Sequence, residues 1–153
     1  MANSYYQVYI QTVFAVKFRD SVLQNDWRPK LLAVIGNLIN KTGCKTMLVN
    51  GVDDHIHCLI GFKPDVSISE LTKTVKAHSS KFINDNKLTS TRFEWQEGYG
   101  AFSYSRSQID EVFKYISNQE EHHKKQTFRA EFIKFLEKFD VPFDEKYIFK
   151  ELE

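Results

Sequence analysis

The chain has 153 residues, the usual size of one domain, and its 42% hydrophobic content is enough to bury a substantial core without disulfide bonds. Its 21 basic and 20 acidic residues nearly cancel, which excludes a protein that attracts nucleic acid through a global positive field. Any nucleic-acid partner must therefore be held by a local basic patch. We expect a single domain over residues 1–153.

The cysteines and the hydropathy pattern favour a cytoplasmic location. The two cysteines, Cys44 and Cys58, form no motif and no disulfide framework, which favours a reducing, cytoplasmic setting. No apolar run approaches the ~20 residues that are needed to cross a bilayer. The first residues also lack the pattern of a signal peptide. We therefore expect a cytoplasmic protein that has no membrane partner.

The first half of the chain alternates between strand-like and helix-like segments. Residues 4–18 are rich in aromatic and β-branched side chains, which predicts a long strand. Residues 21–43 carry apolar side chains at helical spacing and end on Gly43, which suits a helix C-terminus. Residues 44–54 and 55–62 then predict two further strands.

The second half continues this alternation and ends in helices. Residues 67–86 have an apolar stripe and open with Ser67 and Glu70 at the spacing of a capping box, which predicts a second helix. Residues 93–106 are strand-like, and their two glycines mark a bend or a close backbone approach. The remaining segments are a third helix (107–123), a fourth helix (127–139) and an irregular tail (141–149).

The order of these elements predicts the fold. Strand, helix, strand, strand, helix, strand is the split βαβ arrangement of ferredoxin-like folds. We therefore expect an α+β protein with an antiparallel sheet, helices on one face, and extra C-terminal helices. Such a fold supports many unrelated activities, so function must be argued from individual side chains.

Two histidines interrupt an otherwise apolar strand. Because side chains alternate between the two faces of a strand, His55 and His57 share one face, which we expect to be open or covered by polar groups. Two imidazoles at this spacing can converge on one metal ion, and two surface histidines without a ligand are the alternative. Asp53 and Asp54 precede them and are expected to form a turn or to orient an imidazole. The opposite, core face carries Ile56, Cys58, Ile60 and Phe62.

The third predicted helix carries a tyrosine and a glutamine outside its apolar stripe. Tyr115 and Gln119 are four residues apart, which places one above the other on the helix. The tyrosine hydroxyl can then reach a polar cleft, and a boundary tyrosine beside a solvated glutamine is the alternative. Ser107 and Asp110 have the spacing of a cap for this helix.

Basic side chains gather in two places. Such charges usually form a solvated helix face, and near an open sheet they can hold phosphates. The second predicted helix has a polar face that carries Lys73, Lys76, Ser80 and Lys87. A second cluster, near Tyr115 and beyond it, comprises Lys114, Lys124, Lys125 and Arg129.

The combination of these motifs resembles a known family. His55-Ile56-His57 on a strand, followed about sixty residues later by a Tyr-x-x-x-Gln helix, is similar to the HUH single-tyrosine transposases. These include enzymes of insertion sequences that move as single-stranded DNA, and relatives associated with repetitive palindromes. Residues 95–105 also resemble the family's strand before the tyrosine helix, and the resemblance extends from about Tyr5 to Phe128.

The resemblance implies a transposase that cleaves and rejoins single-stranded DNA through a 5′-phosphotyrosine. Tyr115 would be the nucleophile, and His55, His57 and Gln119 would hold a divalent metal ion, with His122 as a rival to the glutamine. Such ligands suit magnesium, manganese or zinc, and the resemblance favours Mg²⁺ or Mn²⁺. The implied partners are single-stranded DNA with hairpin ends and a second copy of the chain in a homodimer, with Tyr115 acting in cis or in trans. The candidate DNA contacts are Lys73, Lys76, Ser80 and Lys114.

Three other functions are compatible with parts of the pattern. A catalytically silent hairpin-binding protein would need the basic surface but not Tyr115. A structural zinc domain would use Cys44 and Cys58 together with the histidines, but Cys58 is predicted to face away from them. An RNA-binding ferredoxin-like domain normally shows paired aromatics within an RNP-like motif, which this sequence lacks.

Overall fold

The computed structural model describes residues 3–19, 22–144 and 148 of the chain. Four strands form one sheet in the order β2-β3-β1-β4, and every neighbouring pair is antiparallel. β1 lies in the middle and pairs with both β3 and β4, as a split βαβ arrangement requires. The strands are β1 (Tyr9–Ala15), β2 (Lys45–Gly51), β3 (His55–Gly61) and β4 (Gly100–Tyr104).

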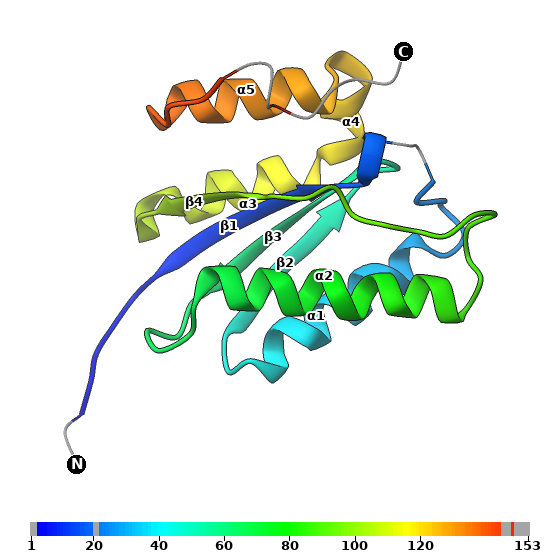
Figure 1. Ribbon diagram of the computed structural model, residues 1–153. Coiled ribbons are helices and arrows are strands. Elements are labelled where there is room, and N and C mark those ends of the chain that lie inside the picture. The colour runs from blue at the N-terminus through cyan, green and yellow to red at the C-terminus, as the bar shows by residue number, and fades with distance from the viewer. Residues whose placement is uncertain (1–2, 20–21, 145–147, 149–153) are drawn as a thin grey trace.

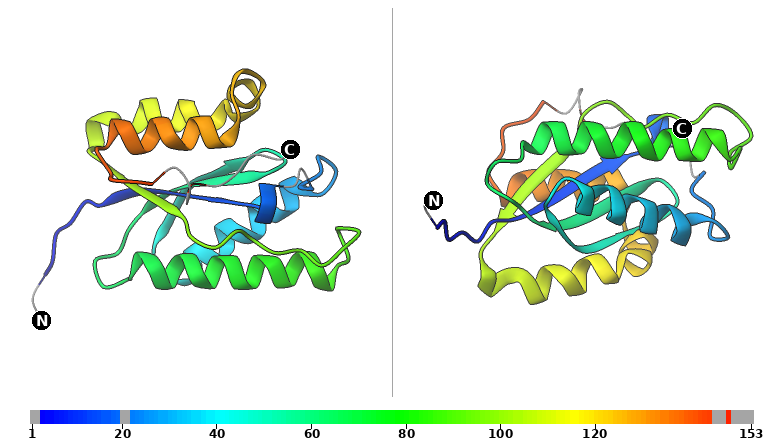
Figure 2. Two further views of the ribbon diagram at one scale, coloured as in Figure 1. Left: turned by 45° about the horizontal axis from the view of Figure 1, so that its top comes forward. Right: turned by 90° about the horizontal axis from the view of Figure 1, so that it is seen from below.

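Helices cover both faces of this sheet. Figures 1 and 2 show α1 and α2 on one face, and α3, α4 and α5 on the other. This confirms the α+β, ferredoxin-like prediction and shows where the extra C-terminal helices lie. None of the helices in the described part of the chain is long and apolar enough to span a bilayer. The helices are α1 (Arg28–Lys41), α2 (Ile68–Asp85), α3 (Ile109–Ser117), α4 (Gln119–Lys125) and α5 (Phe128–Lys138), with 3₁₀ turns η1 (Lys17–Arg19) and η2 (Arg106–Gln108).

Strand alternation divides the apolar side chains into two clusters. Ile56, Cys58 and Ile60 of β3 point toward α1 and α2, as predicted. Leu59 points to the other face and joins a second core, to which β1 and β4 and helices α3 and α5 contribute. The histidine face is therefore not open, and the polar groups expected to cover the two histidines are buried within this second core. The C-terminal helices have apolar stripes of their own, and they bury them on this face.

The ends of several elements differ from the predicted ones. β1 begins only at Tyr9, and α1 begins only at Arg28, with a proline in its first turn. Gly43 follows the end of α1 with a φ of 96°, which confirms its role at the helix C-terminus. The Ser67 hydroxyl accepts a hydrogen bond from the Glu70 backbone N–H at 3.3 Å, which confirms the cap of α2.

The third predicted helix is in fact two helices. Asn118 has a φ of −100° and a ψ of 27°, and this break separates α3 from α4. The predicted cap by Ser107 and Asp110 is also wrong, because a 3₁₀ turn precedes α3. Ser105 and Gln108 form the capping box of that turn. In the predicted tail, residues 141–144 are irregular as expected, and 145–147 and 149 lie outside the described residues.

The two glycines of the 93–106 segment have separate roles. Gly98 has a φ of 87°, which makes the bend before β4. Gly100 allows a close approach: a Cβ at this position would lie 2.5 Å from Cε1 of Phe132 on α5. The absence of a side chain therefore lets α5 pack directly onto β4.

Candidate metal and tyrosine site

His55 and His57 lie in the second core, directly beneath the C-terminal helices. Their residues are 1% and 0% exposed, and their ring centroids are 5.1 Å apart. This excludes the alternative in which they are surface histidines. Two histidines buried this completely need polar partners, because an unpaired imidazole nitrogen in a core is costly.

The Nδ1 side of each imidazole is held by a side-chain acceptor. Nδ1–H of His55 donates to Oδ1 of Asp54 at 2.7 Å, and Nδ1–H of His57 donates to Oε1 of Gln11 at 2.6 Å. Gln11 in turn donates from Nε2 to the hydroxyl of Tyr104 at 2.7 Å. Because Nδ1 of each ring is engaged by an acceptor, Nε2 of each ring is directed away from these partners, as in histidines that bind metals.

Two oxygen atoms meet these nitrogens. Gln119, the first residue of α4, is fully buried and places Oε1 3.0 Å from Nε2 of His55. Glu131, on α5, is 3% exposed and places Oε1 3.0 Å from Nε2 of His57 and 3.4 Å from Nε2 of His55. The structure therefore brings together the predicted ligands and adds a carboxylate to them.

The donor set fits a divalent cation. Two imidazole nitrogens, an amide oxygen and a carboxylate oxygen converge, and the ligand atoms of His55, His57 and Glu131 lie within 4.8 Å of one another. Atoms bound to one small ion at about 2.1 Å are themselves ~3.0–3.4 Å apart, which matches the contacts between the oxygens and nitrogens. The Nε2 of Gln119 is buried without a hydrogen-bond partner, so the oxygen is the atom of this amide that the site engages. Nitrogen and oxygen ligands together suit magnesium, manganese or zinc.

Burial and close contacts shift the pKa values of His55, His57 and Glu131. Burial opposes the charged form of His55, but hydrogen bonds and charges from Asp54 and Glu131 outweigh it and raise its pKa to about 9. Burial lowers the pKa of His57 more than Glu131 raises it. Burial alone would raise the pKa of Glu131, but its hydrogen bonds to the two imidazoles hold that pKa far below the usual range. The carboxylate is therefore ionised and attracts a cation.

Tyr115 lies at the edge of this donor set. Its hydroxyl donates to Oε2 of Glu131, and its ring stacks on His122 with centroids 4.2 Å apart. Burial, and then the negative charge of Glu131, raise the pKa of the Tyr115 hydroxyl above its usual value. Tyr115 also lines a cleft of about 430 Å³, together with Glu131, Lys134 and Lys138. Tyr115 and Gln119 were predicted to lie one above the other on one helix, but they belong to α3 and α4, from which Tyr115 reaches Glu131 and Gln119 reaches His55.

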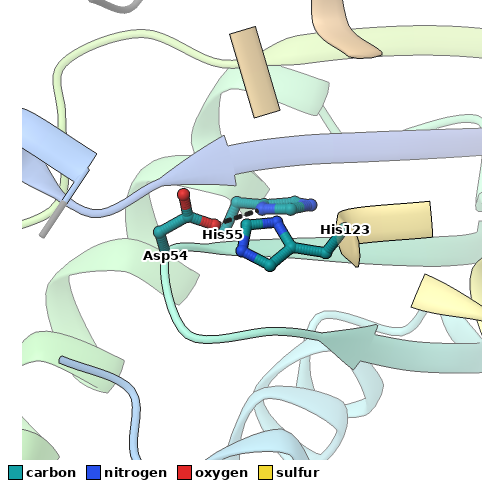
Figure 3. Close-up of side chains that lie close together, drawn as sticks. All are labelled: Asp54, His55 and His123. Carbon is teal, nitrogen blue, oxygen red and sulfur yellow. Dashed lines mark hydrogen bonds and ion pairs between the residues drawn. The ribbon is translucent and has the colours of Figure 1, made fainter. Parts of the chain in front are cut away.

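Asp54 and His123 lie beside His55 at one side of the site. Figure 3 shows Asp54, His55 and His123 close together, with the hydrogen bond between Asp54 and His55 drawn as a dashed line. These three form a second group with the composition of a metal site, but Nδ1 of His55 already donates to Asp54 and offers no lone pair there. His122 belongs to neither of the two groups of potential ligands in the described residues.

The predicted DNA contacts lie in two different places. Lys73, Lys76 and Ser80 are on α2, which covers the sheet face opposite to the histidines (Figure 1). Lys76 donates to the backbone oxygens of residues 96 and 98 at 2.6 and 2.9 Å, and burial lowers its pKa. Lys114 is exposed on α3, the helix of Tyr115. The structure thus brings Lys114 to the helix of the site but not the residues of α2.

Sequence reasoning missed Glu131 and Gln11. Glu131 did leave a signal, because it lies three residues after Phe128 and beside Phe132, within the apolar stripe of its helix. An acidic residue on a buried stripe indicates a paired or metal-bound carboxylate. Gln11 lies within a strand of mostly apolar residues, which is a similar but weaker signal.

Comparisons with known proteins identify the family of the chain. Residues 4–119 match the family described as IS200-like transposases. The ISDra2 transposase TnpA of Deinococcus radiodurans is 23% identical over 119 residues, which cover 74% of this chain and 85% of that protein. The match includes the predicted histidines, tyrosine and glutamine within its span, since residues 55–119 lie inside the family region.

Two solved structures share the fold. One is the crystal structure of a transposase from Deinococcus radiodurans, with a TM-score of 0.64, 19% identity, and coverage of 78% of this chain and 95% of that one. The other is a REP-associated tyrosine transposase bound to a REP hairpin, with a TM-score of 0.57, 12% identity, and coverage of 84% and 74%. The family resemblance inferred from His55, His57 and Tyr115 is thereby confirmed: the chain belongs to the family of IS200-like transposases.

Proposed function

We propose that this transposase cleaves and rejoins single-stranded DNA through a covalent bond to Tyr115, with a divalent metal ion held by His55, His57 and Gln119. One observation carries the proposal. The tyrosine hydroxyl lies against a buried group of metal-type ligands and at the same time lines an open cleft. Membership of a transposase family and the fold of a tyrosine transposase support it.

The chemistry assigned to Tyr115 is an exchange of phosphodiesters. A bond forms between the tyrosine oxygen and phosphorus as the bond from phosphorus to the 3′ oxygen breaks. The 3′ end leaves as a hydroxyl, and the 5′ phosphate stays on the tyrosine. Because one phosphodiester replaces another, a second 3′ hydroxyl can reverse the step and rejoin the strands without ATP. A phenol with an ordinary pKa near ~10 is a better leaving group in that reversal than an alkoxide.

The surrounding residues prepare the site for a phosphate. Asp54 and Gln11 hold the imidazoles with Nε2 facing the centre, so the ligands need no reorientation. A divalent ion bound there would polarise a non-bridging oxygen of the scissile phosphate, and Mg²⁺ or Mn²⁺ is the proposed ion. Lys134 and Lys138 line the cleft beside Tyr115 and supply positive charge for the DNA backbone.

The proposed partners follow from the family. The relative solved with a REP hairpin supports single-stranded DNA with hairpin ends as the substrate. A homodimer is proposed on the family resemblance alone. Tyr115 contacts Glu131 of its own chain, which supports attack in cis. Contacts of Lys73, Lys76, Ser80 and Lys114 with DNA stay predictions.

A covalent-adduct assay tests the function. The protein is incubated with labelled single-stranded element ends and Mg²⁺ or Mn²⁺, and denaturing gels detect DNA that is linked to protein. We expect an adduct with the unmodified chain and none with Tyr115→Phe, while the exposed Tyr99→Phe serves as the matched control. Hairpin binding without any adduct in the unmodified chain would instead identify a catalytically silent binding protein. An adduct formed by Tyr115→Phe would show that another nucleophile is used.

A further inference from the structure

Glu131 lies on α5, beyond the residues that match the transposase family. We propose that its carboxylate is a further ligand of the metal site and that the same carboxylate positions the hydroxyl of Tyr115. The inference rests on the proposed function, because it concerns the same ion and the same tyrosine. It extends that function by assigning to one side chain a link between the metal and the nucleophile.

The two oxygens of Glu131 have different partners. Oε1 lies 3.0 Å from Nε2 of His57 and 3.4 Å from Nε2 of His55, on the side where the two Nε2 atoms converge. Oε2 accepts the hydrogen bond from the hydroxyl of Tyr115. The carboxylate therefore spans the space between the ligand nitrogens and the proposed nucleophile.

The charge of Glu131 favours a cation at this place. The residue is 3% exposed, and its ion pairs within the described residues are with His55 and His57, which must be neutral to bind a metal. Lys134 and Lys138 line the same cleft, but Lys134 donates to Gln126 at 3.0 Å and Lys138 lies over the ring of Phe139. A buried carboxylate is costly without a positive partner, and a divalent ion bound by both Nε2 atoms would supply that charge once the imidazoles are neutral.

Packing around Glu131 holds α5 against the site. The ring of Phe128 stacks on His55 with centroids 4.3 Å apart, and Phe132 packs onto Gly100 of β4. Both phenylalanines belong to the second core, and the Thr127 hydroxyl caps α5 by accepting from the Ala130 backbone N–H. This packing therefore holds the backbone of Glu131 beside the ring nitrogens. A cation bound by both Nε2 atoms would therefore meet Oε1 as well.

A carboxylate ligand also changes which ions the site prefers. It adds a hard, negatively charged oxygen to two nitrogens and an amide oxygen, which favours Mg²⁺ and Mn²⁺ over softer ions. Glu131→Gln keeps the size and one oxygen of the side chain but removes its charge. The substitution thus separates the role of a charged ligand from that of a space-filling side chain.

The test measures Mn²⁺ binding to metal-stripped protein by calorimetry, with the free-Mn²⁺ EPR signal as a second reading. We expect Glu131→Gln to raise the Kd for Mn²⁺ by about tenfold or more, which is the usual range for a residue that supports a metal site. Glu137→Gln, an exposed glutamate on the same helix, is the matched control and should leave the Kd within about twofold. A second measurement is the ¹³C chemical shift of the Tyr115 ring carbon that bears the hydroxyl, assigned with Tyr115→Phe. This chemical shift should change in Glu131→Gln and not in Glu137→Gln.

The outcomes distinguish this inference from the proposed function. An unchanged or tighter Kd in Glu131→Gln, with binding still abolished by His55→Ala, would overturn Glu131 as a ligand and leave the proposed function standing. A weakened Kd in a protein that forms no DNA adduct would overturn the proposed function alone. A wild-type chain that binds no Mn²⁺ would overturn both metal claims. Circular dichroism of each variant shows that the fold is retained.

Discussion

Gln11 and His57 are joined across the two central strands by a hydrogen bond of 2.6 Å between Oε1 and Nδ1. The amide is itself held by Tyr104, whose hydroxyl accepts from Nε2 of Gln11 at 2.7 Å. Oε1 is thus the atom that faces the histidine, and the ring presents its Nε2 to the centre of the site. An amide from the middle strand therefore determines which nitrogen of His57 is available.

The first prediction concerns this amide. Gln11→Leu keeps the bulk of a fully buried side chain but removes the acceptor, so His57 loses the partner that orients it. We expect the Kd for Mn²⁺ to rise by about 10–100-fold, which is the usual cost of losing such a partner. Tyr104→Phe should have a smaller effect in the same calorimetric titration, because Gln11 remains. An unchanged Kd in Gln11→Leu would show that the ring orientation is set by other contacts.

The second prediction concerns the pH dependence of the metal-free protein. The pKa of His55 is raised from 6.5 to about 9, so its contribution to stability is fully present below pH 6.5 and is lost as the pH rises toward 9. We expect the free energy of unfolding in EDTA to fall across this window, by at most about 1.4 kcal/mol per pH unit. Asp54→Asn removes one of the two carboxylates responsible and should flatten this slope. Urea unfolding at several pH values measures it, and an identical slope in Asp54→Asn would contradict the assignment.

The sequence was sufficient for features that depend on local pattern. Strand alternation separated His55 and His57 from the core face that carries Cys58, and the structure has that division. The Ser67 cap and the Gly43 terminus were also predictable, because each depends on backbone groups within a few residues. These rules apply before any tertiary contact forms.

Features that depend on tertiary packing were not predictable in this way. Periodicity shows that Phe128, Glu131 and Phe132 share a stripe, but not which face of the sheet that stripe covers. The partner that explains the buried carboxylate of Glu131 is His57, which is 74 residues away in the sequence. No glycine or proline near Asn118 indicates the break between α3 and α4. It is visible only in the backbone angles of the folded chain.

The third prediction compares two glycines. A Cβ on Gly100 would lie 2.5 Å from Phe132 and 3.0 Å from Phe102, both buried rings. Gly100→Ala should therefore push α5 away from β4 and lower the free energy of unfolding by about 1–3 kcal/mol. Gly36→Ala, inside α1, meets only an ordinary contact of 3.5 Å with Thr46 and should instead raise it by about 0.5–1 kcal/mol. Urea denaturation tests both signs, and a neutral Gly100→Ala would contradict the close packing of α5.

The last prediction concerns Cys58, which lies on the strand of the histidines but faces the other core. Its residue is 1% exposed, and burial raises the pKa of the thiol to about 12, so almost none is thiolate at pH 8. We expect a thiol reagent to label Cys58 only at the rate of unfolding, and Cys58→Ala to leave the Kd for Mn²⁺ unchanged. Rapid labelling that bound metal suppresses would instead place this thiol among the ligands, as in a structural zinc domain. Mass spectrometry of peptides from protein labelled with and without Mn²⁺ decides between these outcomes, because strand alternation forbids Cys58 and His57 from reaching the same ion.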